Sequence, residues 1–201
     1  DITEIAEEYG AMIMVDDCHG EGVLGGGKGI VGHFGLQGRV DFEIGSYSKA
    51  MGVQGGILAG SELVRSYAIN HSRSWLLSGS QPPGVAAAQK AAVEVLMEEP
   101  QHVRKLWENT NYFRKQLQSM GFDTGRSETP IIPVMCGDSK VAKDLSSMLR
   151  ESGILVGAIV FPMVSRDKAR VRTQISSGLT RKDLDIVLSE FERCGKKLRL
   201  I

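Results

Sequence analysis

The sequence predicts a globular α/β protein. An apolar run at 11–15 ends in Asp16 and Asp17, which is typical of a buried parallel strand whose carboxyl end faces a ligand-binding crevice. Apolar stripes with helical spacing at 85–95 and 184–191 indicate amphipathic helices between such strands. With 42% hydrophobic and 24% charged residues among 201, the composition is that of an ordered chain.

In the first half of the chain, short helices and strands alternate around a glycine-rich loop at 20–38. Gly10 ends the first helix, and Ser61 and Pro83 are favourable starts for two later ones. We expect, in order, a helix at 2–9, strands at 11–15, 41–46 and 56–59, a helix after Ser61 and a long helix from Pro83 to about Met97.

The pattern changes at Pro100, so we predict two domains, 1–99 and 100–201. Thr180 and Asp183 have the spacing of a capping box, which predicts the start of the last helix. The expected elements of the second domain are a helix of about five turns ending at Gly121, strands at 131–136 and 169–175, an apolar stretch near Leu155, a helix at 141–150 and a last helix buried through Leu184, Val187, Leu188 and Phe191.

Charge and composition exclude several classes of function. The 24 Lys and Arg residues balance 24 Asp and Glu residues, which argues against nucleic acid as a partner. The longest apolar run, at 154–164, is too short to span a membrane, and no signal peptide is visible. Three widely spaced cysteines predict neither a disulfide framework nor a metal site. We therefore expect a cytoplasmic protein with free thiols and without a metal.

The glycine-rich loop contains the start of a P-loop pattern at 22–28. The next residue is Gly29, where nucleotide binding needs a Ser or Thr hydroxyl, and no buried strand directly precedes Gly22. A nucleotide-binding loop is therefore the third of our interpretations, behind a plain surface loop. The chain has 24 glycines, which cluster between Gly20 and Gly60. We interpret this excess as backbone clearance around a cofactor.

Two further motifs carry chemistry. Asp16 and His19 follow one strand end, although either could be an ordinary loop residue. Ser46 and Lys49 follow another strand end, where the lysine can bind a carbonyl covalently while hydroxyls hold a phosphate. A single lysine is more often a solvated surface residue. The combination of these two motifs with a glycine-rich segment nevertheless favours a binding site.

These motifs, in this order and spacing, resemble those of the α-oxoamine synthases, pyridoxal-phosphate enzymes of the aspartate aminotransferase fold. The resemblance extends over essentially the whole chain. It rests on 15–20 (Val-Asp-Asp-Cys-His-Gly), 46–50 (Ser-Tyr-Ser-Lys-Ala), Gly55 with Gly56, 78–83 (Ser-Gly-Ser-Gln-Pro-Pro) and 169–173 (Ala-Arg-Val-Arg-Thr). It implies the carboxyl-terminal part of an aminotransferase-like large domain with a mostly parallel sheet, followed by a small α+β domain.

The resemblance also implies a role for each site residue. Lys49 would bind pyridoxal phosphate (PLP) covalently and later remove the Cα proton of the substrate. Asp16 would sit against the pyridinium nitrogen, and His19 would bond the phenolic oxygen of the ring. Ser46 would contact the phosphate, and Ser78 would reach the phosphate of the partner subunit. Arg172 would bind the substrate carboxylate; spacing alone does not choose it over Arg170, for which a surface ion pair is the alternative.

Within the family, the motifs most resemble the glycine C-acetyltransferases, also called 2-amino-3-ketobutyrate CoA ligases. The expected reaction condenses glycine or another small amino acid with an acyl-CoA, such as acetyl-CoA. The alternatives are 8-amino-7-oxononanoate synthase, which uses alanine and a pimeloyl thioester, and a non-catalytic fragment. Because family subunits carry roughly as many residues again upstream, we expect this chain to be the carboxyl-terminal half of a subunit. The resemblance also implies a homodimer whose active site lies at the subunit interface.

Overall fold

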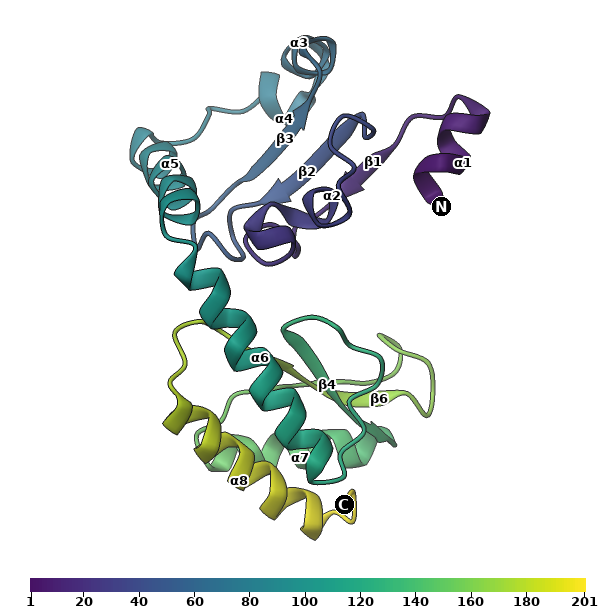
Figure 1. Cartoon of the computed structure of the whole chain (residues 1–201), viewed down its shortest axis with the longest axis vertical. Helices are drawn as coiled ribbons and strands as arrows, with labels where there is room; N and C mark the ends of the chain where they lie inside the picture. The colour runs from purple at the N-terminus through teal and green to yellow at the C-terminus, as the bar shows by residue number, and fades with distance from the viewer. The chain divides into compact units, whose positions relative to one another are not determined.

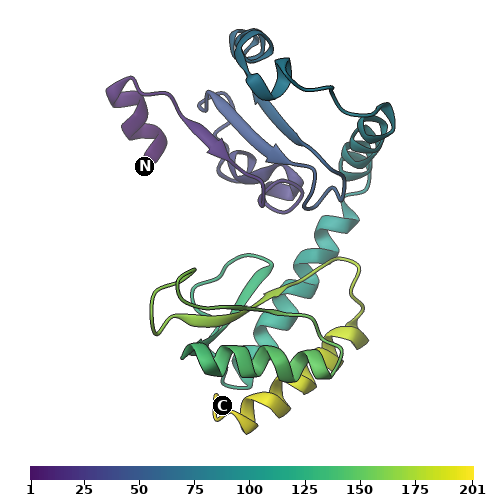
Figure 2. The same cartoon turned by 180° about the vertical axis from the view of Figure 1, so that it is seen from behind.

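The computed structural model describes all 201 residues and divides them into two compact units, 1–103 and 104–201. The predicted domain boundary before Pro100 lies a few residues earlier and stays a prediction. Figures 1 and 2 show each unit as one small sheet with its helices. None of the helices combines the length and the apolar character needed to cross a membrane.

The sheet of the first unit has the strand order β1-β2-β3. The pair β1 and β2 is parallel, and β2 and β3 are antiparallel, so the sheet is mixed rather than mostly parallel within this chain. The elements of this unit are α1 (Ile2–Tyr9), β1 (Met14–Asp16), η1 (Gly25–Gly27), α2 (Gly29–Phe34), β2 (Phe42–Ser46), β3 (Gly56–Gly60), α3 (Glu62–His71), α4 (Arg73–Leu76) and α5 (Pro83–Glu98).

Two expectations for the first unit were wrong. The predicted loop at 20–38 contains η1 and α2, and Val31 of α2 is buried against the rest of the unit. The run at 11–15 is not buried on both faces: Met12 is 76% and Met14 64% exposed, because β1 pairs with only one strand and α2 covers only part of the sheet (Figure 1).

The second unit encloses a complete core. Its sheet has the order β4-β6-β5 with antiparallel pairing, and buried residues alternate along β4 and β6. Helices pack against the buried face, where Phe191 lies edge-on to both Phe113 and Phe122. The elements are α6 (Gln101–Ser119), which begins in the first unit, then β4 (Ile131–Gly137), α7 (Ser139–Glu151), β5 (Gly157–Ile159), β6 (Ala169–Gln174) and α8 (Arg181–Lys197).

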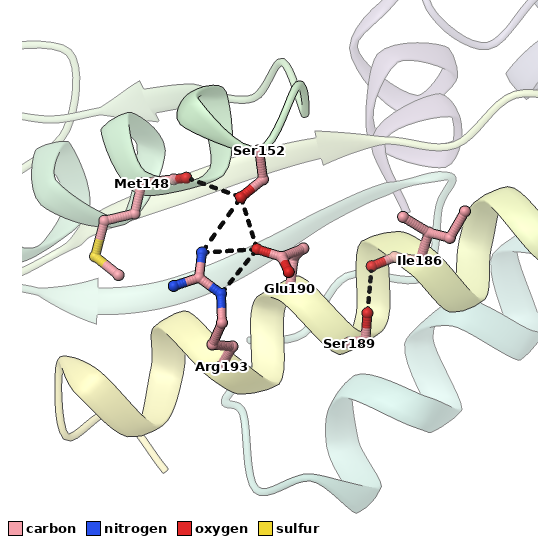
Figure 3. Close-up of polar contacts among 6 residues, drawn as sticks. All are labelled: Met148, Ser152, Ile186, Ser189, Glu190 and Arg193. Carbon is pink, nitrogen blue, oxygen red and sulfur yellow. Dashed lines mark hydrogen bonds and ion pairs between the residues drawn. The ribbon is translucent and has the colours of Figure 1, made fainter.

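Polar contacts fix α8 at its start and along its second half. At its start, Thr180 and Asp183 form the predicted capping box. Nearer its end, Glu190 accepts hydrogen bonds from Ser152, at the end of α7, and from Arg193 one turn later (Figure 3). These bonds join α7 to α8 beside the hydrophobic core.

Candidate active site

The carboxyl ends of β1 and β2 lie side by side at one edge of the first sheet. Parallel pairing places Asp16, the last residue of β1, beside Ile44 of β2, and β2 ends two residues later at Ser46. In α/β folds this edge is where ligands bind, since polar groups of successive loops converge there. The sequence predicted this arrangement from the two strand-end motifs.

Lys49 stands on a tight turn that follows β2. The Tyr47 N–H donates to the carbonyl of Gly55 at 3.0 Å, and the Val53 N–H donates to the carbonyl of Tyr47 at 2.8 Å. The hydroxyls of Ser46 and Ser48 share a hydrogen bond of 2.7 Å within the same turn. The Lys49 side chain is exposed, and none of the ion pairs of the chain includes it. The turn therefore presents an amine without a competing carboxylate.

Asp16 is held in its ionised form by its own loop. Its carboxylate accepts hydrogen bonds from the thiol and from the backbone N–H of Cys18, the latter at 3.2 Å. These bonds, with a smaller contribution from the charge of His19, lower the pKa of Asp16 below its ordinary value. An exposed, ionised carboxylate is the group that a protonated ring nitrogen requires.

Cys18 connects the two loops electrostatically. The hydrogen bond to Asp16 raises the pKa of the Cys18 thiol, and the positive charge of Lys49 acts in the opposite direction. Asp16 and Lys49 therefore both lie within electrostatic range of Cys18. The structure places four predicted residues, Asp16, His19, Ser46 and Lys49, at or directly after two adjacent strand ends.

The glycines nearest these residues make room for carboxylates of the chain itself. A Cβ added at Gly20 or Gly29 would lie about 2 Å from an oxygen of Asp17, and one at Gly45 would lie 1.9 Å from an oxygen of Glu21. The expectation that glycine clearance serves a cofactor is therefore wrong at these positions. Glycine is required at these positions because acidic side chains of the chain occupy the space that a Cβ would need.

The loop that resembles a P-loop has another conformation. Glu21 and Lys28 form an isolated antiparallel bridge, and the Gly22 N–H donates to the carbonyl of Gly27 at 3.0 Å. The strand before it, β1, ends at Asp16, so the loop does not connect a strand directly to a phosphate-binding helix. Its backbone groups bond within the loop instead.

Ser78 and Arg172 lie on other segments of the chain. Ser78 is exposed after α4, where its hydroxyl accepts the N–H of Ser80 at 3.2 Å. Arg172 belongs to the second unit, on β6, and its Nε is buried without a hydrogen-bond partner. Arg170 forms no ion pair; its Nε donates to the carbonyl of Lys168 at 2.9 Å. A buried, unpartnered guanidinium nitrogen makes Arg172 the better candidate for an anion.

The sequence assigned no role to two acidic residues beside the site, Asp17 and Glu21. Asp17 is 8% exposed and accepts the N–H of Ile30 at 2.6 Å, which ties the end of β1 to α2. Glu21 accepts the backbone N–H of Ser46. The sequence carries only a weak signal for these two roles. Asp17 lies against Gly20 and Gly29, and Glu21 lies against Gly45, but these contacts form only in the folded chain.

The donor set fits PLP. A carboxylate with a lowered pKa suits the ring nitrogen, an amine without an ion pair suits the aldehyde, and the paired hydroxyls of Ser46 and Ser48 suit the phosphate. No group of three or more His, Cys, Asp or Glu side chains has an arrangement suited to a metal ion.

Comparison with known proteins yields several relatives. The chain is 50% identical to 8-amino-7-oxononanoate synthase of Fervidobacterium nodosum and 48% identical to 8-amino-7-oxononanoate synthase 1 of Bacillus subtilis. Both matches cover all of this chain but only 51% and 52% of the relatives, so the chain spans about half their length. 8-amino-7-oxononanoate synthase was the alternative in the sequence analysis, after glycine C-acetyltransferase. These relatives do not support ranking glycine C-acetyltransferase first.

Solved structures agree with this relationship. Serine palmitoyltransferase of Sphingomonas wittichii matches with a TM-score of 0.94 and 27% identity, over all of this chain and 51% of that one. A serine palmitoyltransferase structure solved with PLP matches equally well. The 8-amino-7-oxononanoate synthase of Francisella tularensis, at 20% identity, has the same fold with a TM-score of 0.81, over 98% of this chain and 58% of that one.

The resemblance predicted from the motifs is thereby confirmed, since both kinds of relative are α-oxoamine synthases. The predicted fold class is confirmed by the same structures, and PLP is the cofactor of this family. The profile of the family described as aminotransferase class I and II matches residues 1–191. The chain therefore belongs to the aminotransferase class I and II family, in which its relatives are α-oxoamine synthases.

Proposed function

We propose that this chain is part of a PLP-dependent acyltransferase that joins a small amino acid to an acyl thioester. The observation that carries the proposal is the gathering of Asp16, His19, Ser46 and Lys49 at two adjacent strand ends. The identity of 50% to an α-oxoamine synthase supports it. The activity requires a carbon–carbon bond to form at the amino acid Cα and a thiol to leave.

Bound PLP supplies an electron sink for the negative charge that develops at the Cα atom of the amino acid. Asp16 would hold the ring nitrogen and keep it protonated, because its lowered pKa keeps the carboxylate ionised. His19 donates to or accepts from the phenolic oxygen and so orients the ring. The hydroxyl of Ser46 binds the phosphate.

Lys49 has two tasks in this proposal. Its Nζ would hold the cofactor, and as a free amine it would take the proton from Cα as a general base. The tight turn between Tyr47 and Gly55 supports both tasks, because it fixes the backbone from which the side chain extends.

We assign substrate binding to Arg172 and a contact with the phosphate of a partner subunit to Ser78. The unpartnered Nε of Arg172 supports a carboxylate ligand, which would accept the hydrogen bonds of the guanidinium. The Ser78 assignment implies a homodimer whose active site lies at the subunit interface. A cytoplasmic location stays a prediction from the free thiols.

Alanine and a pimeloyl thioester are the first candidates for the substrates. The names of the 8-amino-7-oxononanoate synthases favour this pair. Glycine and acetyl-CoA are the second pair, as the motifs alone suggested. The exposed strands of the first unit favour one further candidate, a fragment that binds cofactor poorly until other polypeptide covers them.

Thiol release tests the proposal. The purified chain is incubated with PLP and either alanine with pimeloyl-CoA or glycine with acetyl-CoA, and free thiol is measured with a colorimetric reagent. We expect faster release with the first pair and none above background in Lys49→Ala. Release that persists in Lys49→Ala would contradict the proposal, whereas no release from any pair would favour the fragment.

A further inference from the structure

Glu21 is a partly buried carboxylate for which the proposed reaction has no use. It follows the Asp16–His19 loop, yet its side chain reaches the next strand and accepts the backbone N–H of Ser46. Its oxygens press on Gly45, where an added Cβ would lie 1.9 Å from Oε2. Gly45 needs no positive φ, so the close approach of Glu21 is what requires a glycine there.

The backbone of Glu21 is anchored at the end of β1. The N–H groups of Gly20 and Glu21 both donate to the carbonyl of Asp17, at 3.0 and 3.2 Å. Asp17 in turn is fixed by the N–H of Ile30 and by its packing against Gly20. Glu21 therefore bridges two strand ends, with its backbone bound to one and its side chain to the other.

This bridge acts on the residue that we assign to the phosphate. The backbone N–H of Ser46 bonds Glu21. The hydroxyl of Ser46 bonds the hydroxyl of Ser48 at 2.7 Å. The Ser48 N–H donates back to the Ser46 hydroxyl at 3.3 Å. The Glu21 carboxylate therefore contacts the backbone at Gly45 and Ser46, while the Ser46 side chain bonds only within its own turn.

We propose that Glu21 is a positioning residue, which holds the Ser46 backbone so that the Ser46 and Ser48 hydroxyls face the phosphate of PLP. This inference rests on the proposed function. The role requires a hydrogen-bond acceptor and not a charge. Burial and the nearby charges of Asp17 and Glu43 raise the pKa of Glu21, so its surroundings disfavour the anion while retaining the acceptor.

PLP and pyridoxal differ only in the phosphate. Comparing their affinities therefore distinguishes a role at the phosphate from general support of the fold. Dissociation constants for PLP and for pyridoxal are measured by absorbance in the wild type, Glu21→Ala and Glu21→Gln. Glu43→Gln is the matched control, because Glu43 lies on β2 and acts on Glu21 through charge. In Glu21→Ala we expect PLP to bind about tenfold more weakly, as when a buried donor loses its acceptor.

The other results follow from the geometry. Pyridoxal affinity should change less than twofold in Glu21→Ala, and Glu21→Gln and Glu43→Gln should bind PLP like the wild type. Gly45→Ala should mimic Glu21→Ala, since its methyl group takes the place of the carboxylate. The proposal is overturned if Glu21→Ala weakens both ligands equally or neither, or if Glu21→Gln behaves like Glu21→Ala.

Backbone hydrogen exchange of Ser46 gives a second readout that needs no cofactor. Exchange at the Ser46 amide should accelerate at least tenfold in Glu21→Ala and stay unchanged in Glu21→Gln, with the bonded Val53 amide as internal reference. If the wild type binds no PLP, the proposed function fails for this chain, and the exchange result still decides whether Glu21 holds Ser46. Unchanged exchange in Glu21→Ala would overturn the positioning role.

Discussion

The two units bury their apolar side chains to very different extents. Of 17 buried hydrophobic residues, only Val31 and Val103 belong to unit 1–103, whereas 16 of the 20 exposed large hydrophobic residues lie there. The second unit has a sheet covered by helices, and the first has a sheet whose β3 is exposed along its whole length. The candidate chemistry lies on the unit that lacks a closed core.

The candidate site and most of the buried core therefore belong to different units. The relatives are about twice as long as this chain, and an α/β sheet normally carries helices on both faces. We therefore expect the first unit to need further polypeptide to cover its strands, while the second unit stands by itself.

The largest expected effect concerns independent folding. A fragment of residues 101–201, which contains all of α6, should unfold in urea in one cooperative transition, because its core is complete. Residues 1–100 should give no sharp transition and should bind a hydrophobic dye. Cooperative unfolding of both fragments with similar midpoints would remove the contrast.

A smaller effect is expected from truncating one apolar side chain in each unit of the full chain. Phe191→Ala should lower the free energy of unfolding by about 3–5 kcal/mol, because Phe191 is fully buried against two other rings. Leu58→Ala, at a site 45% exposed on β3, should cost about 0.5 kcal/mol or less. Urea titrations give both values, and comparable losses would show that β3 is packed.

The smallest expected effect is that the contributions of Glu190 and Glu21 to folding change with pH in opposite directions. Arg193 and Ser152 lower the pKa of Glu190, so its contribution to folding is present above the unfolded pKa and is lost as pH falls through the folded one. Burial raises the pKa of Glu21, so its contribution is present below the unfolded pKa and is lost as pH rises through the folded one.

Carboxyl chemical shifts measured by NMR should therefore place the Glu190 midpoint below, and the Glu21 midpoint above, those of exposed glutamates. Glu190→Gln and Glu21→Gln identify the two signals. Identical midpoints would contradict the environments described for both residues.

Local signals predicted most of the fold. The capping box of Thr180 and Asp183, the Ser61 cap and the Pro83 start each act within one helical turn, so spacing alone locates them. Helix α2 was missed because its glycine-rich segment carries no apolar periodicity, and it forms where Asp17, distant in sequence, accepts the Ile30 N–H.

Strand-end motifs predicted that Asp16 and Ser46 would lie close together, because parallel pairing is a rule of such sheets. The contact of Glu21 with Gly45 and Ser46 joins residues 24 and 25 positions apart and follows no spacing rule.

The net charge of the whole chain did not reveal how charge is divided between the two units. Unit 1–103 carries six Lys and Arg against thirteen Asp and Glu, and unit 104–201 carries eighteen against eleven, so the neutral total conceals a basic unit.

We propose that the strand ends of the first unit hold PLP through Lys49. Borohydride reduction of the chain with PLP, followed by peptide mass spectrometry, measures this directly. We expect one modified residue, Lys49, with the modification lost in Lys49→Ala and retained in Lys28→Ala, since Lys28 lies in the loop that resembles a P-loop. Modification spread over many lysines, or none at Lys49, would contradict it.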